Sequence, residues 1–70
     1  MSQRETLKAV TSEWKTTAEI AGEVPKSCHD AYHHIREVYA DLTQMAKYRL
    51  VEKGYRYHGR ARECTWRLAQ

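Results

Sequence analysis

The spacing of apolar residues predicts two short helices in the first third of the chain. Leu7 and Val10 lie three residues apart and mark the buried side of a helix expected over residues 3–12. Apolar residues at the same spacing predict a second helix over residues 17–23. Pro25 ends this second helix, because the residue before a proline avoids the α-helical region.

A longer apolar stripe in the middle of the chain predicts a third helix over residues 28–48. The stripe consists of Tyr32, Ile35, Tyr39, Leu42 and Ala46. On a helical wheel, the first half of the opposite, solvent-facing side holds His29, Asp30, His33, His34 and Glu37. No glycine or proline interrupts residues 26–53, so the helix could run unbroken over residues 28–48, and an extra turn within this stretch is the alternative.

After Gly54 the pattern changes to alternation, which is typical of strands. Two alternating runs, residues 51–57 and 62–68, flank a turn around Gly59 and predict a β-hairpin. The side expected to face the helices carries Tyr55, Tyr57, Cys64, Trp66 and Leu68. The side expected to face water carries Arg56, Thr65 and Arg67. Residues 1–70 are therefore expected to form a single domain, mainly α with a C-terminal β-hairpin.

Three segments begin with a capping box, in which a Ser or Thr and an acid three residues later satisfy free backbone N–H groups. The pairs are Ser2 with Glu5, Thr16 with Glu19, and Ser27 with Asp30. Each pair precedes helical apolar spacing and so supports one helix start.

Composition places the 70-residue chain among ordinary small globular domains, with 41% hydrophobic and 30% charged residues. It contains no apolar run near the roughly 18 residues of a membrane span, and its N-terminus lacks the apolar stretch of a signal peptide. A soluble cytoplasmic protein is expected. Cys28 and Cys64 are too few for a disulfide framework and are expected to be reduced thiols.

Basic residues are concentrated near the C-terminus. Residues 47–70 hold seven of the 12 Lys and Arg residues but only two of the nine Asp and Glu residues. Such a distribution suggests a surface that meets polyanions, although an ordinary solvated surface is the alternative.

No hydrolase, P-loop or dinucleotide-binding motif is present, so enzymatic activity, a cofactor and a small-molecule substrate are not expected. Cys28, His29, His33 and His34 lie close together in sequence, as zinc ligands do. On the expected helix, however, Cys28 points toward the apolar stripe while His29 and His33 point away from it. No metal site is expected.

Two short motifs resemble the winged helix-turn-helix superfamily. Residues 16–21, Thr-Thr-Ala-Glu-Ile-Ala, resemble the T-x-x-E-[IL]-A opening of the second helix in that superfamily. Residues 50–53, Leu-Val-Glu-Lys, resemble the hydrophobic step that leads into the wing. Within the superfamily, the chain is similar to very small bacterial regulators, such as those controlling pilus operons, and the resemblance extends from Trp14 to Leu68.

The chain departs from the compact family pattern at two places. The stretch between Ile20 and Val51 is longer by about two helical turns, and Arg49 occupies the position of the usual glycine. The extra turns are free to serve as a partner surface.

The resemblance implies a small transcriptional regulator that binds double-stranded DNA. It places the N-terminal half of helix 28–48 in the major groove and the arginine-rich hairpin on the minor groove or phosphates. The residues expected to reach base edges are His29, His33 and Arg36. Those expected at phosphates or in the hairpin contact are Thr16, Thr17, Lys26, Ser27, Arg56, His58, Arg60 and Arg62. The helix front and the hairpin arginines are expected to lie side by side as one positive surface.

Other interpretations stay open at this point. The histidines also fit a solvated polar face, and the two threonines also fit capping alone. Tyr55, Tyr57 and Trp66 could stack on single-stranded bases, although their alternation with charged residues favours core packing. Winged helices also serve as protein adaptors, so the long third helix could instead form a surface for a protein partner or a homodimer.

Overall fold

The chain folds into three helices and a three-stranded antiparallel sheet. The computed structural model describes residues 3–25 and 30–69, so predictions for Ser2, Lys26, Ser27, Cys28 and His29 lie outside the described residues. The elements are α1 (Gln3–Ala9), β1 (Lys15–Thr16), α2 (Thr17–Glu23), α3 (Ala31–Lys47), β2 (Val51–His58) and β3 (Ala61–Leu68). The strand order in the sheet is β1-β3-β2. The three helices and the C-terminal hairpin are confirmed, but β1 makes the fold mixed α/β instead of mainly α.

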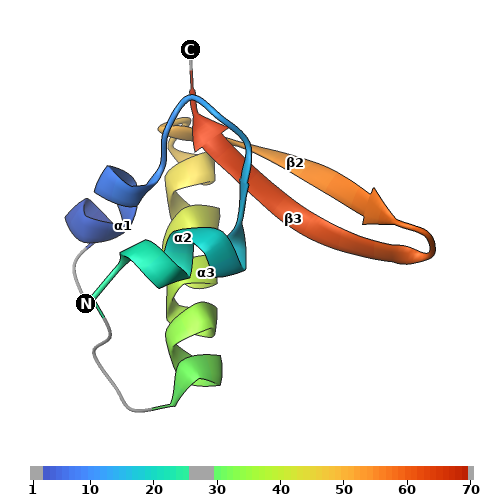
Figure 1. Ribbon diagram of the computed structural model, residues 1–70. Coiled ribbons are helices and arrows are strands. Elements are labelled where there is room, and N and C mark those ends of the chain that lie inside the picture. Colours follow the sequence, from blue (N-terminus) through green and yellow to red (C-terminus); the bar gives the residue numbers. More distant parts are fainter. Residues whose placement is uncertain (1–2, 26–29, 70) are drawn as a thin grey trace.

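The helices pack together on one side, and the hairpin of β2 and β3 extends away from them (Figure 1). β1 pairs with the end of β3 nearest the helices, with Lys15 opposite Trp66 and Thr16 opposite Thr65. This pairing attaches the base of the hairpin to the start of α2. The outer part of the hairpin, around Gly59, projects beyond the helices.

The predicted bounds are correct for α2, but the predicted end of α1 is wrong. α2 spans residues 17–23 as predicted, since the capping box at its start and Pro25 after its end are strong local signals. α1 ends at Ala9 instead of residue 12. The carbonyl of Thr11 accepts a hydrogen bond from the Leu68 N–H at 2.8 Å, so the chain has left the helix to meet the end of β3.

α3 begins at Ala31, three residues later than predicted, and ends at Lys47. The helix begins here because the Asp30 side chain accepts a hydrogen bond from the Tyr32 N–H at 2.9 Å and caps it. From Ala31 to Lys47 the helix is continuous, so no extra turn interrupts it. Neither α3 nor any other helix in the described parts of the chain has the length and apolar character that crossing a bilayer requires.

The buried side of α3 is rotated from the predicted one. His34, Val38, Leu42 and Met45 are buried, whereas Tyr32, Ile35 and Tyr39 are exposed. His34 was expected on the solvent side, yet it is only 2% exposed because its Nε2 hydrogen-bonds the Ala21 carbonyl of α2 at 2.9 Å. The prediction was wrong because α3 has two adjacent apolar stripes, and the one with Val38 and Met45 packs into the core.

The hairpin also differs from the prediction in which side chains are buried. Trp66 is in the core as expected, and its indole N–H donates to the Thr17 hydroxyl at 2.9 Å. Thr65, which was expected to face water, is buried beside β1. Tyr55 and Tyr57 were expected to face the helices but are 44% and 68% exposed. Their part of the hairpin lies beyond the helices, so few core residues are available to cover them.

A short connection joins α3 to the hairpin. Arg49 adopts a positive φ of 63°, the conformation that favours the glycine expected at this position. The Arg49 N–H donates to the Ala46 carbonyl at 3.0 Å, and the Leu50 N–H donates to the Met45 carbonyl at 2.9 Å. These bonds satisfy the carbonyls at the end of α3 in the manner of a glycine-type cap.

Candidate nucleic-acid interface

The exposed side of α3 carries an arginine held against an aromatic ring. The Arg36 guanidinium lies 5.7 Å from the centroid of the Tyr32 ring, one turn earlier. Among the described residues, Arg36 forms no ion pair with a carboxylate. His33 is also exposed, but its Nδ1 lies 4.0 Å from Asp30, which neutralises the imidazole when it is protonated. Of the predicted base-reading residues that are described, Arg36 is thus the one whose charge has no carboxylate partner among the described residues.

The predicted cations of the hairpin fall into two groups. Arg56 lies 3.7 Å from Glu19, and His58 lies 3.6 Å from Glu63, so both have carboxylate partners within the protein. Arg60 and Arg62 are exposed and form no ion pair within the described part of the chain. These two arginines are the hairpin cations with charge most available to an external anion.

The two threonines at the start of α2 have roles inside the protein. Thr16 is buried, and its hydroxyl accepts a hydrogen bond from the Glu19 N–H at 3.2 Å. Its own N–H donates to the Glu19 carboxylate at 3.0 Å, which completes the predicted capping box. The Thr17 hydroxyl accepts from the Trp66 indole. Capping and core packing account for both residues, which are therefore weak candidates for phosphate contacts.

The carboxylate in this capping box is stabilised in its charged form. The backbone N–H of Thr16, and then its hydroxyl, hold the pKa of Glu19 below the ordinary value. Burial opposes this effect, while the nearby charges of Arg56 and Lys15 add to it. Glu19 is therefore an anion at neutral pH, and it is paired with Arg56.

Strand register separates the hairpin side chains into two faces. Because side chains alternate along a strand, residues paired across β2 and β3 share a face. The first, called here the aromatic face, holds Val51, Lys53, Tyr55, Tyr57, Arg62, Cys64, Trp66 and Leu68. The second, called the ion-paired face, holds Glu52, Gly54, Arg56, His58, Ala61, Glu63, Thr65 and Arg67. Both carboxylates of the hairpin lie on the ion-paired face, where Glu52 contacts Arg67 at 2.6 Å and Glu63 contacts His58.

Lys53 lies among three rings on the aromatic face. Its ammonium nitrogen is 5.5–5.6 Å from the ring centroids of Tyr39, Tyr55 and Trp66, within the range of cation–π attraction. Burial lowers the pKa of Lys53, but the hydrogen bond to Tyr39 and the nearby Tyr39, Cys64 and Tyr55 groups outweigh it, so the pKa is raised overall. Lys53 is therefore a stable cation.

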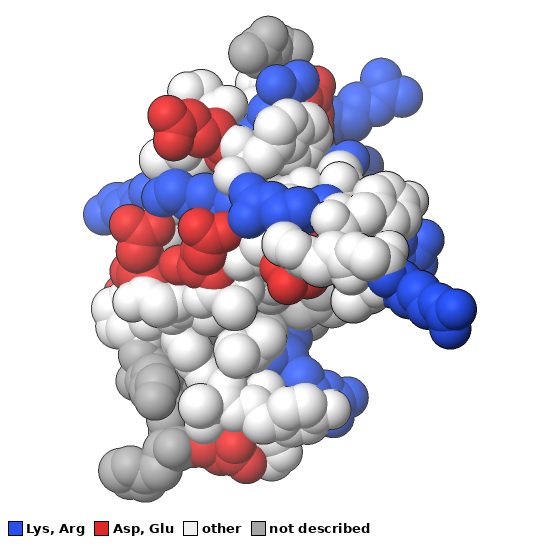
Figure 2. Space-filling model, turned by 45° about the vertical axis from the view of Figure 1, so that its right-hand side comes forward, with Lys and Arg blue, Asp and Glu red and all other residues white. Residues whose placement is uncertain are grey.

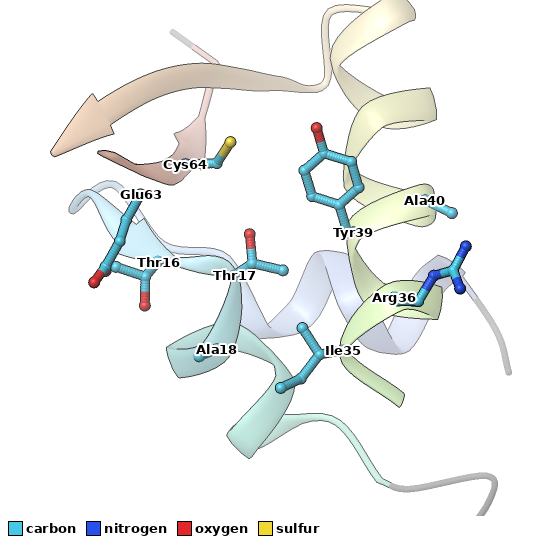
Figure 3. A pocket seen from close by; sticks show the side chains of 9 residues that line it. All are labelled: Thr16, Thr17, Ala18, Ile35, Arg36, Tyr39, Ala40, Glu63 and Cys64. Atoms are coloured by element: carbon cyan, nitrogen blue, oxygen red, sulfur yellow. The ribbon is translucent and has the colours of Figure 1, made fainter. Parts of the chain in front are cut away.

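A groove of about 550 Å³ separates α3 from β3. It is lined by Thr16, Thr17, Ala18, Ile35, Arg36, Tyr39, Ala40, Glu63 and Cys64. The Tyr39 ring and the Cys64 thiol point toward each other across it, whereas Arg36 extends away from the hairpin (Figure 3). The lining is mostly apolar, and Glu63 places a carboxylate in it. The continuous positive surface expected between the helix front and the hairpin is therefore interrupted by an apolar groove.

The charges on the surface are not evenly spread. Lys and Arg side chains follow the right-hand edge of the molecule in Figure 2, while most of the Asp and Glu side chains in this view lie left of centre. A band of basic side chains also crosses the middle of the view. The hairpin side is thus the more basic part of the visible surface.

Sequence reasoning missed Lys53, Tyr39 and the exposure of Tyr55 and Tyr57 as features of this surface. The alternation of aromatic and basic residues in Tyr55-Arg56-Tyr57 was a visible signal. This alternation also fits core packing. The sequence does not show that the tyrosines are exposed, because how far the hairpin projects beyond the helices depends on tertiary structure. Neither Cys64 nor any other described residue belongs to a cluster of potential metal ligands.

Comparison of the chain with protein-family models, with curated proteins and with solved structures found no match.

Proposed function

We propose that this protein binds double-stranded DNA as a small winged-helix transcriptional regulator. The order helix, short strand, helix, helix, hairpin supports the winged-helix assignment, because the resemblance implies a hairpin that follows the third helix. The residues of the T-x-x-E-I-A motif also form the capped start of α2. The exposed side of α3 would enter the major groove, and the end of the hairpin would lie along the neighbouring backbone.

The observation that carries this proposal is the availability of Arg60 and Arg62. Both are exposed beside the turn at Gly59, on a hairpin that projects beyond the helices. Neither hairpin carboxylate is paired with these two arginines: Glu52 contacts Arg67, and Glu63 lies 3.6 Å from His58, with which it forms an ion pair when the imidazole is protonated. Exposed arginines of this kind suit phosphates or a narrow minor groove.

Arg36 is the proposed base-reading residue on α3. Its guanidinium can form two hydrogen bonds with O6 and N7 of guanine, the pairing that arginine favours in the major groove. The Tyr32 ring beside it restricts the side chain and so lowers the entropy lost on binding. His29 stays a prediction for a base contact, and Lys26 and Ser27 stay predictions for phosphate contacts, since all three lie outside the described residues.

The test is fluorescence anisotropy with a labelled duplex of random sequence at low salt. Replacing Arg60 and Arg62 by alanine is expected to weaken binding about tenfold or more, because two phosphate-contacting charges are lost. The matched control is Lys8→Ala with Arg49→Asn, which removes two exposed charges away from the end of the hairpin. The proposal fails if the wild-type protein leaves the duplex unbound at ~100 µM, or if both double variants bind as the wild type does.

A protein adaptor is the second candidate function, and the groove favours it. Ile35 and Tyr39 expose apolar surface there, on the side of α3 that was expected to be buried. Such a surface could serve a protein partner or a second copy of the chain. The duplex titration discriminates between the two candidates, because an adaptor would leave the DNA free.

A further inference from the structure

We propose that the aromatic face of the hairpin binds single-stranded DNA by stacking bases on Tyr55 and Tyr57. This inference goes beyond duplex binding and is independent of it. Stacking requires access to the flat face of a base, and in a duplex those faces are covered by the neighbouring base pairs. A single strand is therefore the nucleic acid that exposed aromatic rings fit best.

The exposure of the two rings is the first observation. Tyr55 and Tyr57 lie on the same face of β2, and their strand partners on that face are Cys64 and Arg62. Both tyrosines are exposed, and Tyr57 is the most exposed large hydrophobic residue of the described chain. Tyrosines two residues apart on a strand are separated by about 6.7 Å, which is roughly twice the thickness of a stacked base. One base can therefore enter between them if it displaces the Arg62 guanidinium, which lies 4.4 Å from the centroid of the Tyr55 ring.

The charge of this face is the second observation. Lys53 and Arg62 share the face with the tyrosines, and no carboxylate of the hairpin does. The Arg62 guanidinium lies 4.4 Å from the centroid of the Tyr55 ring, and the Lys53 ammonium lies 5.6 Å from the same centroid. Tyr55 thus lies next to two cations that can contact the phosphate of a stacked nucleotide, and one of them, Arg62, is the strand partner of Tyr57. A face that combines exposed rings with cations matches the bases and phosphates of a nucleic acid, and not an apolar peptide.

The groove beside α3 extends the same surface. Cys64 belongs to the aromatic face and also lines the groove, where Tyr39 lies opposite it (Figure 3). A strand running along β2 toward the helices would therefore meet a third exposed ring and an apolar space of about 550 Å³. The groove lining also holds Arg36 and the Glu63 carboxylate. An unstacked base fits beside the Tyr39 ring, while its backbone follows Lys53.

The experiment uses the full chain and two labelled 12-nucleotide probes, an oligothymidylate and an abasic strand with the same phosphates. Anisotropy is measured at roughly 50 mM salt, since electrostatic binding weakens as salt rises. The wild-type protein is expected to bind the thymidylate at least about tenfold more tightly than the abasic strand. The Tyr55→Ala/Tyr57→Ala variant is expected to bind the two probes equally.

Two further variants separate stacking from other effects. Tyr55→Phe/Tyr57→Phe keeps the rings and is expected to keep the preference for thymidylate, whereas Tyr48→Ala removes an exposed tyrosine at the end of α3 and is expected to change nothing. Circular dichroism of each variant reports folding.

Equal binding of both probes by the wild type would overturn the proposal, as would an unchanged preference in the double alanine variant. If the double alanine variant lost affinity equally for thymidylate and for a duplex, the tyrosines would be duplex contacts and the proposal would also be wrong. If the wild-type protein does not bind a duplex, the two single-stranded probes can still be compared. Each proposal can therefore be rejected without the other.

Discussion

The hydroxyl of Thr17 satisfies a polar atom that the core would otherwise leave unpaired. Trp66 is fully buried, and its indole N–H can only donate a hydrogen bond. Thr17 supplies the acceptor from the first turn of α2, 49 residues away in sequence. This contact joins the start of α2 to the sheet, together with the β1 pairing and the Arg56–Glu19 ion pair.

Replacing Thr17 by valine is expected to lower the free energy of unfolding by about 1–3 kcal/mol, because the shape is kept while the buried indole loses its partner. Urea unfolding followed by tryptophan fluorescence measures this. The control is Thr43→Val, since the Thr43 hydroxyl donates to the Tyr39 carbonyl of its own helix on the exposed side. Equal effects of the two substitutions would show that the buried bond contributes nothing.

His34 shows why single residues of the core were hard to predict. A histidine among charged neighbours is usually exposed, and nothing local indicates its hydrogen bond to a carbonyl of α2. Its Nδ1 is buried and has no partner among the described residues. The position of His34 follows from how α3 packs on α2, which is a tertiary property.

Among the elements, α2 is the one whose start is most fully determined by its own sequence. Thr16 and Glu19 satisfy each other's backbone N–H groups, an arrangement in which the cap contributes about 1 kcal/mol. The ionised Glu19 carboxylate also lies near the positive end of the helix dipole. The stability of α2 therefore depends on the charge state of Glu19.

The Glu19→Gln variant is expected to be less stable than the wild type at neutral pH, with the difference disappearing in acid. The pKa of Glu19 is lowered in the folded state, so its contribution is fully present above the ordinary value of 4.5 and is lost as pH falls through the lowered value. Thermal unfolding between pH 7 and pH 3 measures the difference. Glu13→Gln, at another exposed carboxyl, is the control. A difference that persisted at the acid end would contradict the assignment.

Elements whose own residues carry a clear pattern were predicted. Features that depend on contacts between distant parts of the chain were not. The capping box and Pro25 located α2, and alternation about Gly59 located the hairpin within one residue at each end of the turn. β1 has two residues, too few for any pattern, and exists because it pairs with β3. The rotation of α3 escaped prediction because both of its stripes are apolar enough to be buried.

On the scale of the whole molecule, the fold presents an exposed helix side and a basic hairpin on either side of a groove. The concentration of basic residues in the last third was apparent from the sequence. Their separation into an ion-paired face and an aromatic face was not, because it depends on strand register and on the length of hairpin beyond the helices. The basic character of the candidate site was thus apparent from the sequence, whereas the exposure of Tyr55 and Tyr57 was not.

The salt dependence of duplex binding tests this arrangement as a whole. Each phosphate contact contributes about −0.9 to the slope of log affinity against log salt, so Arg60→Ala/Arg62→Ala is expected to make the slope shallower by about 2. Titrations at several salt concentrations measure it, and Lys8→Ala/Arg49→Asn is expected to retain the wild-type slope. A lower affinity with an unchanged slope would indicate an indirect effect of the double variant.

The connection at Arg49 and Leu50 has a consequence for any ligand that spans the groove. The hydrogen bonds from the Arg49 and Leu50 N–H groups to the carbonyls of α3 restrict the backbone of this connection, and β2 begins at the next residue. The angle between helix and hairpin is therefore set before anything binds. Because this angle is fixed in advance, binding loses less conformational entropy than it would with a flexible connection. The groove therefore accepts only partners that already match its width.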